Sequence, residues 1–221
     1  MIQQFGGEAL SRELTLLQTD LIFLGGLVEN SITQALNSLS SRNLEGSRGV
    51  IKNDDEIDKK RYQIEDHCIK IIREFAPVAG DMRNVFSSLL CSQELERMGD
   101  YAVGIAQISI KMGPGPTFKK LVDIPKMANL SINMMKKSLA SLTENDRDLA
   151  LTIAKSVLPD DDKVDQLNIL IQEEMIELMV KESNPENIRN GTYLIWISHN
   201  LERIADRATN IAERAIFQAG F

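Results

Sequence analysis

The sequence LERMGDYAVGIA, from Leu95 to Ala106, returns near the end of the chain as LERIADRATNIA, from Leu201 to Ala212. Seven of the twelve positions are identical, and each copy holds a glutamate followed four residues later by an aspartate. Four residues are slightly more than one helical turn, so the two carboxylates of a copy project from the same side of a helix. Their mutual repulsion costs about 0.2–0.5 kcal/mol. A chain that keeps this pair twice either exposes it to solvent or uses it to hold a cation.

The repetition extends well beyond this motif. A shift of 106 residues places Arg-Asn at 83–84 on Arg-Asn at 189–190, and a shift of 107 places DDEID at 54–58 on DDKVD at 161–165. Each half of the chain therefore carries one D-x-x-x-D and one E-x-x-x-D. The repeat is about half the chain, which is too long for a solenoid unit of about 20–50 residues. It predicts two duplicated domains, 1–116 and 117–221, joined at the Gly-Pro-Gly-Pro segment.

Composition excludes several classes of protein. Hydrophobic residues make up 43% of the 221 residues but aromatic residues only 5%, which favours helices over β-sandwiches. A net charge of −7 argues against nucleic-acid binding and against attachment to a membrane through basic residues. The sequence shows neither a membrane-spanning apolar run nor a signal peptide, and Cys68 and Cys91 suggest no disulfide framework. We expect a cytoplasmic protein.

Helical periodicity dominates the chain, and no stretch alternates with a period of two. The pattern predicts six long helices, over 11–41, 47–75, 81–112, 125–142, 146–181 and 185–219. Asp81 is expected to cap the third of them, and Pro185 to lie in the first turn of the last. Three such helices with short connections form an antiparallel bundle. The expected fold is therefore all-α, with two pseudo-symmetric antiparallel three-helix bundles.

Helical angles of 100° per residue place the acidic pairs relative to the apolar stripes. The Glu/Asp pairs lie well over 90° from the centre of the stripe, and the Asp/Asp pairs lie at its edge. We therefore expect the acids on outer faces, where the D-x-x-x-D of one helix meets the E-x-x-x-D of its neighbour. Sites made of carboxylates alone favour hard cations such as Mg²⁺, Ca²⁺, Mn²⁺ or ferric iron. Pro159, which replaces Lys52 of the first half, is expected to kink the fifth helix.

The same acids also have a purely structural interpretation. A Glu/Asp pair on a helix usually belongs to a solvent-exposed face, and Arg97 and Arg203 can neutralise part of the charge. His199 lies on the side of Glu202, but its counterpart Gln93 has no comparable chemistry, which favours a surface role. Three functions stay open from the residues: a metal-binding regulator, a carboxylate-bridged metalloenzyme acting as hydrolase or oxidoreductase, and a purely structural adaptor. The absence of Glu-x-x-His pairs argues against the enzyme.

Four motifs in order resemble one known family. ERMGDYAVGIA and ERIADRATNIAE resemble the signature of the PhoU family, PVAGDMR at 77–83 resembles the loop before its third helix, and DDEID and DDKVD resemble its acidic stretches. The likeness covers nearly the whole chain and implies two three-helix bundles. It also implies surface clusters of iron or zinc held by the acids of both halves. Carried over residue by residue, the metal-binding residues are Asp54, Asp58, Glu96, Asp100, Asp161, Asp165, Glu202 and Asp206.

The resemblance also implies a function. Members of the family act as negative regulators of phosphate uptake and of phosphate-responsive signalling. The implied partners are the ATPase subunit of the phosphate ABC transporter and the phosphate sensor histidine kinase, so the chain would meet the membrane only through protein partners. A homodimer is expected, as for other adaptors built from long helices.

Overall fold

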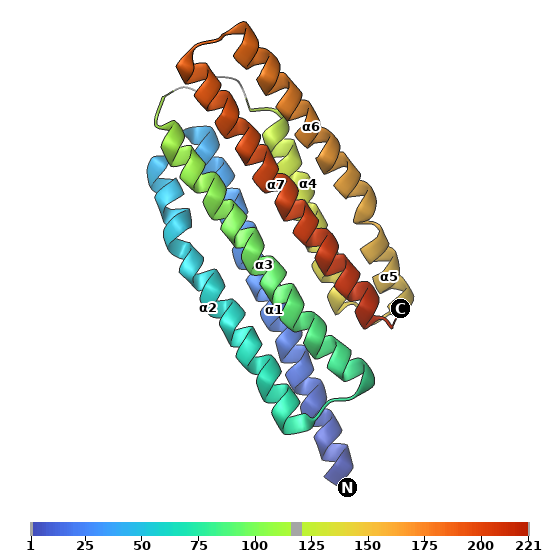
Figure 1. Cartoon of the computed structure of the whole chain (residues 1–221). Helices are drawn as coiled ribbons and strands as arrows, with labels where there is room; N and C mark the ends of the chain where they lie inside the picture. Colours follow the sequence, from blue (N-terminus) through green and yellow to red (C-terminus); the bar gives the residue numbers. More distant parts are fainter. Residues whose placement is uncertain (1, 116–120, 221) are drawn as a thin grey trace.

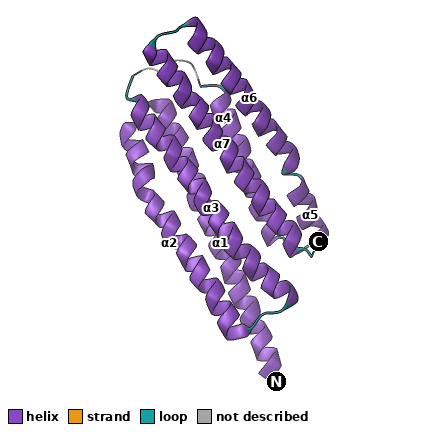
Figure 2. Cartoon of the chain, viewed as in Figure 1, coloured by secondary structure: helices purple, strands orange, loops and turns teal. Residues whose placement is uncertain are grey.

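The computed structural model describes residues 2–115 and 121–220, which form helices joined by short turns, without β-strands in these ranges (Figures 1 and 2). The helices are α1 (Ile2–Ser41), α2 (Leu44–Phe75), α3 (Ala79–Met112), α4 (Asp123–Thr143), α5 (Arg147–Lys155), α6 (Leu158–Lys181) and α7 (Pro185–Gln218).

The chain follows the same path twice. Helices α1, α2 and α3 form one antiparallel bundle, and α4, the α5–α6 pair and α7 form the other (Figure 1). The expected all-α fold of two pseudo-symmetric bundles is confirmed. The boundary expected between residues 116 and 117 lies outside the described residues.

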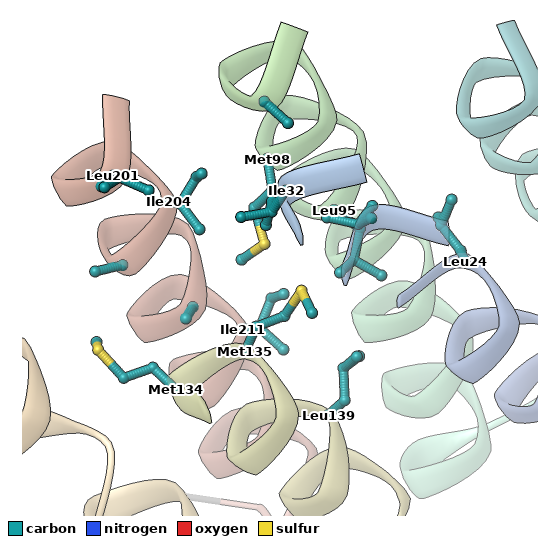
Figure 3. Packing of buried hydrophobic residues seen from close by; sticks show 14 of the residues in the cluster. Leu24, Ile32, Leu95, Met98, Met134, Met135, Leu139, Leu201, Ile204 and Ile211 are labelled. Carbon is teal, nitrogen blue, oxygen red and sulfur yellow. The ribbon is translucent and has the colours of Figure 1, made fainter. Parts of the chain in front are cut away.

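The two bundles share one hydrophobic core. Helix α3 packs along α7, and α1 packs against α4, so these four helices form the centre while α2 and α6 lie at the two outer sides (Figure 1). Figure 3 shows side chains of all four central helices meeting between the bundles. Those labelled include Leu24 and Ile32 of α1, Leu95 and Met98 of α3, Met135 and Leu139 of α4, and Leu201, Ile204 and Ile211 of α7.

The spacing of apolar residues explains why these segments are helical. In α1 the fully buried positions recur every three or four residues, which is the period of one helix face. Each such leucine contributes about 1.5–3 kcal/mol on leaving water. The buried positions of α1 are Leu17, Leu21, Leu24, Val28, Ile32, Ala35 and Leu39.

Most helix ends agree with the sequence, and one expected cap does not. Asn43 Oδ1 accepts a hydrogen bond from the Gly46 N–H at the start of α2, and Pro185 lies in the first turn of α7. Asp81 was expected to cap α3, and this is wrong. The helix begins at Ala79, so Asp81 already lies inside its first turn, where its charge favours the helix dipole without a capping bond.

The fifth expected helix is two helices. α5 ends at Lys155, a turn follows at residues 156–157, and α6 begins at Leu158 with Pro159 in its first turn. A proline has no N–H to donate and its ring clashes with the carbonyl four residues earlier, so Pro159 and Lys155 cannot share a continuous helix. The expected effect of Pro159 is confirmed, and the helix predicted over 146–181 was too long.

Buried polar side chains also join neighbouring helices. Ser131 Oγ of α4 lies 3.1 Å from Leu201 O of α7, and Ser138 Oγ lies 2.7 Å from Ala208 O. Each hydroxyl also reaches the carbonyl four residues earlier in α4, Met127 O at 3.0 Å and Met134 O at 2.9 Å, so its single proton is shared between acceptors of the two helices. These contacts fix the register of α4 against α7.

Glu94 of α3 joins the two bundles through an ion pair and a hydrogen bond with α7. Glu94 of α3 accepts hydrogen bonds from Arg207 Nη1 at 3.2 Å and from Asn210 Nδ2 at 3.1 Å, both on α7. Only 20% of the Glu94 side chain and 14% of the Arg207 side chain are exposed, so solvent screens this ion pair weakly.

Candidate metal centre

The first groove is the surface between α2 and α3 that carries Asp54, Asp58, Glu96 and Asp100. None of these side chains is buried, as the helical angles predicted. They are nevertheless close enough to interact: partial burial, then the charges of Asp100, Asp58 and Glu96, raise the pKa of Asp54 to about 6. Partial burial and the charge of Asp58 also raise the pKa of Asp100. The D-x-x-x-D and the E-x-x-x-D therefore face each other across the groove.

The second groove is the equivalent surface between α6 and α7, with Asp161, Asp165, Glu202 and Asp206. Partial burial, followed by the charges of Asp165 and Asp206, raises the pKa of Asp161 to about 6. Burial and the charge of Asp206 likewise raise the pKa of Asp165. The break before α6 precedes these acids in the chain, so Pro159 does not separate them from α7.

The two grooves differ in how their charge is neutralised. In the second groove, His199 Nδ1 lies 2.8 Å from Glu202 Oε2, and Arg203 Nη1 lies 2.8 Å from Asp206 Oδ2. Among the described residues, none forms an ion pair with the four acids of the first groove. The charge of the first groove is therefore offset only at longer range, by Arg61 and Arg97.

One acidic residue beside the second groove was missed by the sequence analysis. Asp160 is buried, with Lys137 Nζ of α4 at 2.6 Å and Lys163 Nζ at 2.7 Å. The hydrogen bond from Lys137, and then that from Lys163, lowers its pKa. Asp160 thus holds the start of α6 against α4 and positions Asp161 next to it. The sequence holds a signal for this position, because an acid directly after a proline is typical of a helix N-terminus.

Both grooves suit a hard cation in their chemistry. Their ligands are carboxylate oxygens, which Mg²⁺, Ca²⁺, Mn²⁺ and ferric iron prefer, and Asp161 Oδ1 is buried without a hydrogen-bond partner. Within the described ranges, no three His, Cys, Asp or Glu side chains converge on one point that could hold a metal ion. Binding in either groove therefore requires these side chains to rotate.

The fold and the grooves define a class of protein: an internally duplicated helical protein with two open carboxylate surfaces. No helix in residues 2–115 and 121–220 is long and apolar enough to cross a membrane. The histidine-free first groove does not resemble the enclosed Glu and Glu-x-x-His sites of di-metal bundle enzymes.

Comparisons with known proteins identify the family. The model of the PhoU domain matches residues 21–109 and again 124–215, once in each half. The phosphate-specific transport system accessory protein PhoU homologue of Aquifex aeolicus is 34% identical over 88% of this chain and 85% of its own length. The homologue of Deinococcus radiodurans is 31% identical over 94% of both chains.

Two crystal structures are similar over nearly their whole length. The phosphate transport system regulatory protein PhoU of Streptococcus pneumoniae superposes with a TM-score of 0.83 at 29% identity, covering 96% of this chain and 97% of its own. PhoU of Pseudomonas aeruginosa gives 0.85 at 29% identity, covering 94% and 97%. The chain belongs to the PhoU family. This is a family of regulatory accessory proteins and not of enzymes, so the metalloenzyme alternative is set aside.

Proposed function

We propose that this chain is a cytoplasmic accessory protein of phosphate uptake that binds metal ions in its two grooves. In this role it docks on the ATPase subunit of a phosphate ABC transporter and on the phosphate sensor kinase, as a negative regulator of uptake and signalling. Family membership and the names of its relatives support the link to phosphate transport. The observation that carries metal binding is a cluster of four carboxylates on two adjacent helices, repeated at equivalent places, in which partial burial and then the neighbouring charges raise the pKa of Asp54 and of Asp161.

A bound cation removes the repulsion among these charges, which is the physical reason for the proposal. Carboxylates that raise one another's pKa gain favourable interactions when a divalent or trivalent ion sits among them. Iron and zinc follow from the family resemblance, and Mg²⁺, Mn²⁺ and Ca²⁺ follow from the oxygen-only ligands. The first groove is expected to bind more tightly, because no described histidine or arginine forms an ion pair with its acids, and Arg61 and Arg97 act on them only at longer range.

Elemental analysis of protein purified without chelator tests metal binding. The Glu96→Gln/Asp100→Asn variant is expected to lose at least about half of the bound metal, because it removes two ligands from the groove that is expected to bind more tightly. Glu173→Gln/Glu177→Gln is the matched control, since it neutralises two exposed acids four residues apart on α6. Equal metal content in all three proteins would contradict metal binding in the first groove.

Docking is tested by co-purification from cells grown in high and in low phosphate. We expect the tagged chain to retain the transporter ATPase subunit and the sensor kinase in at least one of the two states. Deletion of the gene is expected to raise expression of phosphate-starvation genes in high phosphate, as for a negative regulator. Failure of both partners to co-purify at low salt, with unchanged expression, would contradict the proposed regulation.

The expected homodimer is a separate part of the proposal. Light scattering after gel filtration measures it directly, with and without added metal. A mass of twice 24.8 kDa is expected, and a single-chain mass in both conditions would contradict it.

A further inference from the structure

The outward face of α6 carries a line of exposed apolar side chains that no other described part of the chain covers. Leu158, Ile169, Ile176 and Val180 are exposed by 53%, 56%, 53% and 75%. Their spacings of 11, 7 and 4 residues are near whole numbers of turns, so they lie within about 40° of one line. We call these four residues the α6 stripe. It is about 33 Å long at 1.5 Å per residue.

The charge beside the α6 stripe has one sign. Asp162 and Asp165 lie almost on the line itself, between Leu158 and Ile169. Glu173 and Glu177 lie on one side of it, within about 80° of its centre, and the nearest lysines of α6, Lys163 and Lys181, lie about 120° away. Lys163 is moreover engaged with Asp160. These four exposed acids form the acidic border of the α6 stripe.

The equivalent face of α2 provides an internal comparison. Tyr62 and Ile69 occupy the positions of Ile169 and Ile176, and they are similarly exposed. Arg73, however, replaces Val180 at the end of the line, and the Arg61 guanidinium lies 3.7 Å from the centre of the Tyr62 ring. Asp55, Asp58 and Asp66 keep three of the four acids, but Lys70 replaces Glu177. The α2 face is therefore shorter in apolar residues and mixed in charge at its end.

We propose that the α6 stripe binds an amphipathic helix of a partner protein, apolar on one side and flanked by lysine or arginine. An apolar helix face is buried most readily against another apolar helix face, and basic flanks pair with the acidic border. An anionic membrane or a nucleic acid would be repelled by the same border. A second copy presenting its own α6 stripe would set acids against acids. The proposal rests on the docking function above and assigns it a surface.

A designed peptide tests this surface without knowledge of the natural partner. The probe is a fluorescein-labelled helix of leucine and lysine with period 3.6, and a leucine–glutamate peptide of the same pattern is its control. Fluorescence anisotropy on the full chain is expected to show binding of the basic peptide only. Ile169→Gln/Ile176→Gln is expected to weaken it about tenfold, because central apolar contacts dominate such interfaces. Both side chains are exposed, and thermal melting checks that the variant stays folded.

Matched variants of α2 show whether the basic peptide binds the α6 stripe or is attracted to the acidic protein in general. Tyr62→Gln/Ile69→Gln is expected to change the affinity less than twofold, and to leave the α6 stripe intact. Asp162→Asn/Glu173→Gln/Glu177→Gln is expected to weaken binding far more than Asp55→Asn/Glu56→Gln/Asp66→Asn, although both triple variants change the net charge equally.

Equal effects of the α6 and α2 variants, or no effect of either, would overturn the proposal. The peptide assay contains no transporter component, so its outcome is independent of the proposed role in phosphate uptake. That role fails only through the co-purification and gene-expression measurements.

Discussion

Pro159 of α6 and Lys52 of α2 occupy equivalent positions of the duplicated chain, but Pro159 lies in the first turn of its helix whereas Lys52 lies in a helix interior. A proline is therefore expected to be costly at position 52 and nearly neutral at position 159. Lys52→Pro is expected to lower the free energy of unfolding by about 3 kcal/mol, since the residue loses a backbone hydrogen bond and its ring meets the preceding turn. Urea denaturation followed by circular dichroism measures this loss.

Pro159→Ala is the reverse experiment. A first-turn proline gives up no hydrogen bond, so its replacement is expected to change stability by less than about 1 kcal/mol. A large destabilisation by Pro159→Ala, or a harmless Lys52→Pro, would show that the helix break has another origin.

Asp54→Asn is expected to stabilise the protein at neutral pH in the absence of metal. The folded-state pKa of about 6 lies above the ordinary value of 3.8, so folding favours protonated Asp54. Its contribution to stability is full below pH 3.8 and is lost as the pH rises through about 6. At pH 7 the charged carboxylate is thus unfavourable, by about 1 kcal/mol after solvent screening in the half-open groove.

Thermal melting in chelator at pH 7 and at pH 4 checks the effect. Asp54→Asn should melt above the parent protein at pH 7 and close to it at pH 4. Asp66→Asn, an exposed site on the same helix, should change stability by no more than a few tenths of a kcal/mol at either pH. An equal gain in both variants would point to net charge and not to the first groove.

Glu94→Ala tests the contact between the bundles. It leaves the Arg207 guanidinium nearly buried without its carboxylate, and it removes an acceptor from Asn210. The expected loss is about 2 kcal/mol in the free energy of unfolding. Glu45→Ala, whose side chain is 84% exposed beside Arg48, should cost less than about 1 kcal/mol. Equal costs would mean that the pair between the bundles contributes no more than a surface ion pair.

Gly99 of α3 offers a further test, of the close approach between α2 and α3. A Cβ added there would lie 3.0 Å from Ile57 Cδ1 and 3.4 Å from Asp54 Oδ1, so α3 approaches α2 closely at the first groove. Gly99→Leu is expected to cost about 2 kcal/mol, because its side chain must displace α2. Gly26→Leu, which meets open space on α1, should be neutral or stabilising in the same denaturation experiment. If both leucines are tolerated alike, close packing does not shape the groove.

Much of the fold could be predicted because it depends on period and repetition. The apolar period of 3.6 residues indicates the helices, and the recurrence of LER-x-x-D after 106 residues indicates two similar bundles. The start of α3 and the division between α5 and α6 were harder to predict from the sequence. Both depend on local backbone choices within a few residues, such as an extended Val78 before Ala79, which periodicity does not determine.

The site could be predicted only as far as helix faces determine it. A spacing of four residues places each acidic pair on one side of a helix, and the pKa shifts agree that the pairs of neighbouring helices interact. That these acids hold metal stays a prediction. The spacing of three residues places His199 beside Glu202 within α7. The burial of Asp160 depends on Lys137 from another helix, which no pattern within α6 reveals.

The two serines of α4 have a mechanical consequence. Ser131 and Ser138 reach the carbonyls of Leu201 and Ala208 at the same offset of 70 residues. Sliding α4 along α7 by one turn, about 5.4 Å, would remove both contacts at once and leave each hydroxyl only its acceptor within α4. The second bundle therefore resists shear. We accordingly expect a disturbance at one end of α7 to tilt α4 and α7 together.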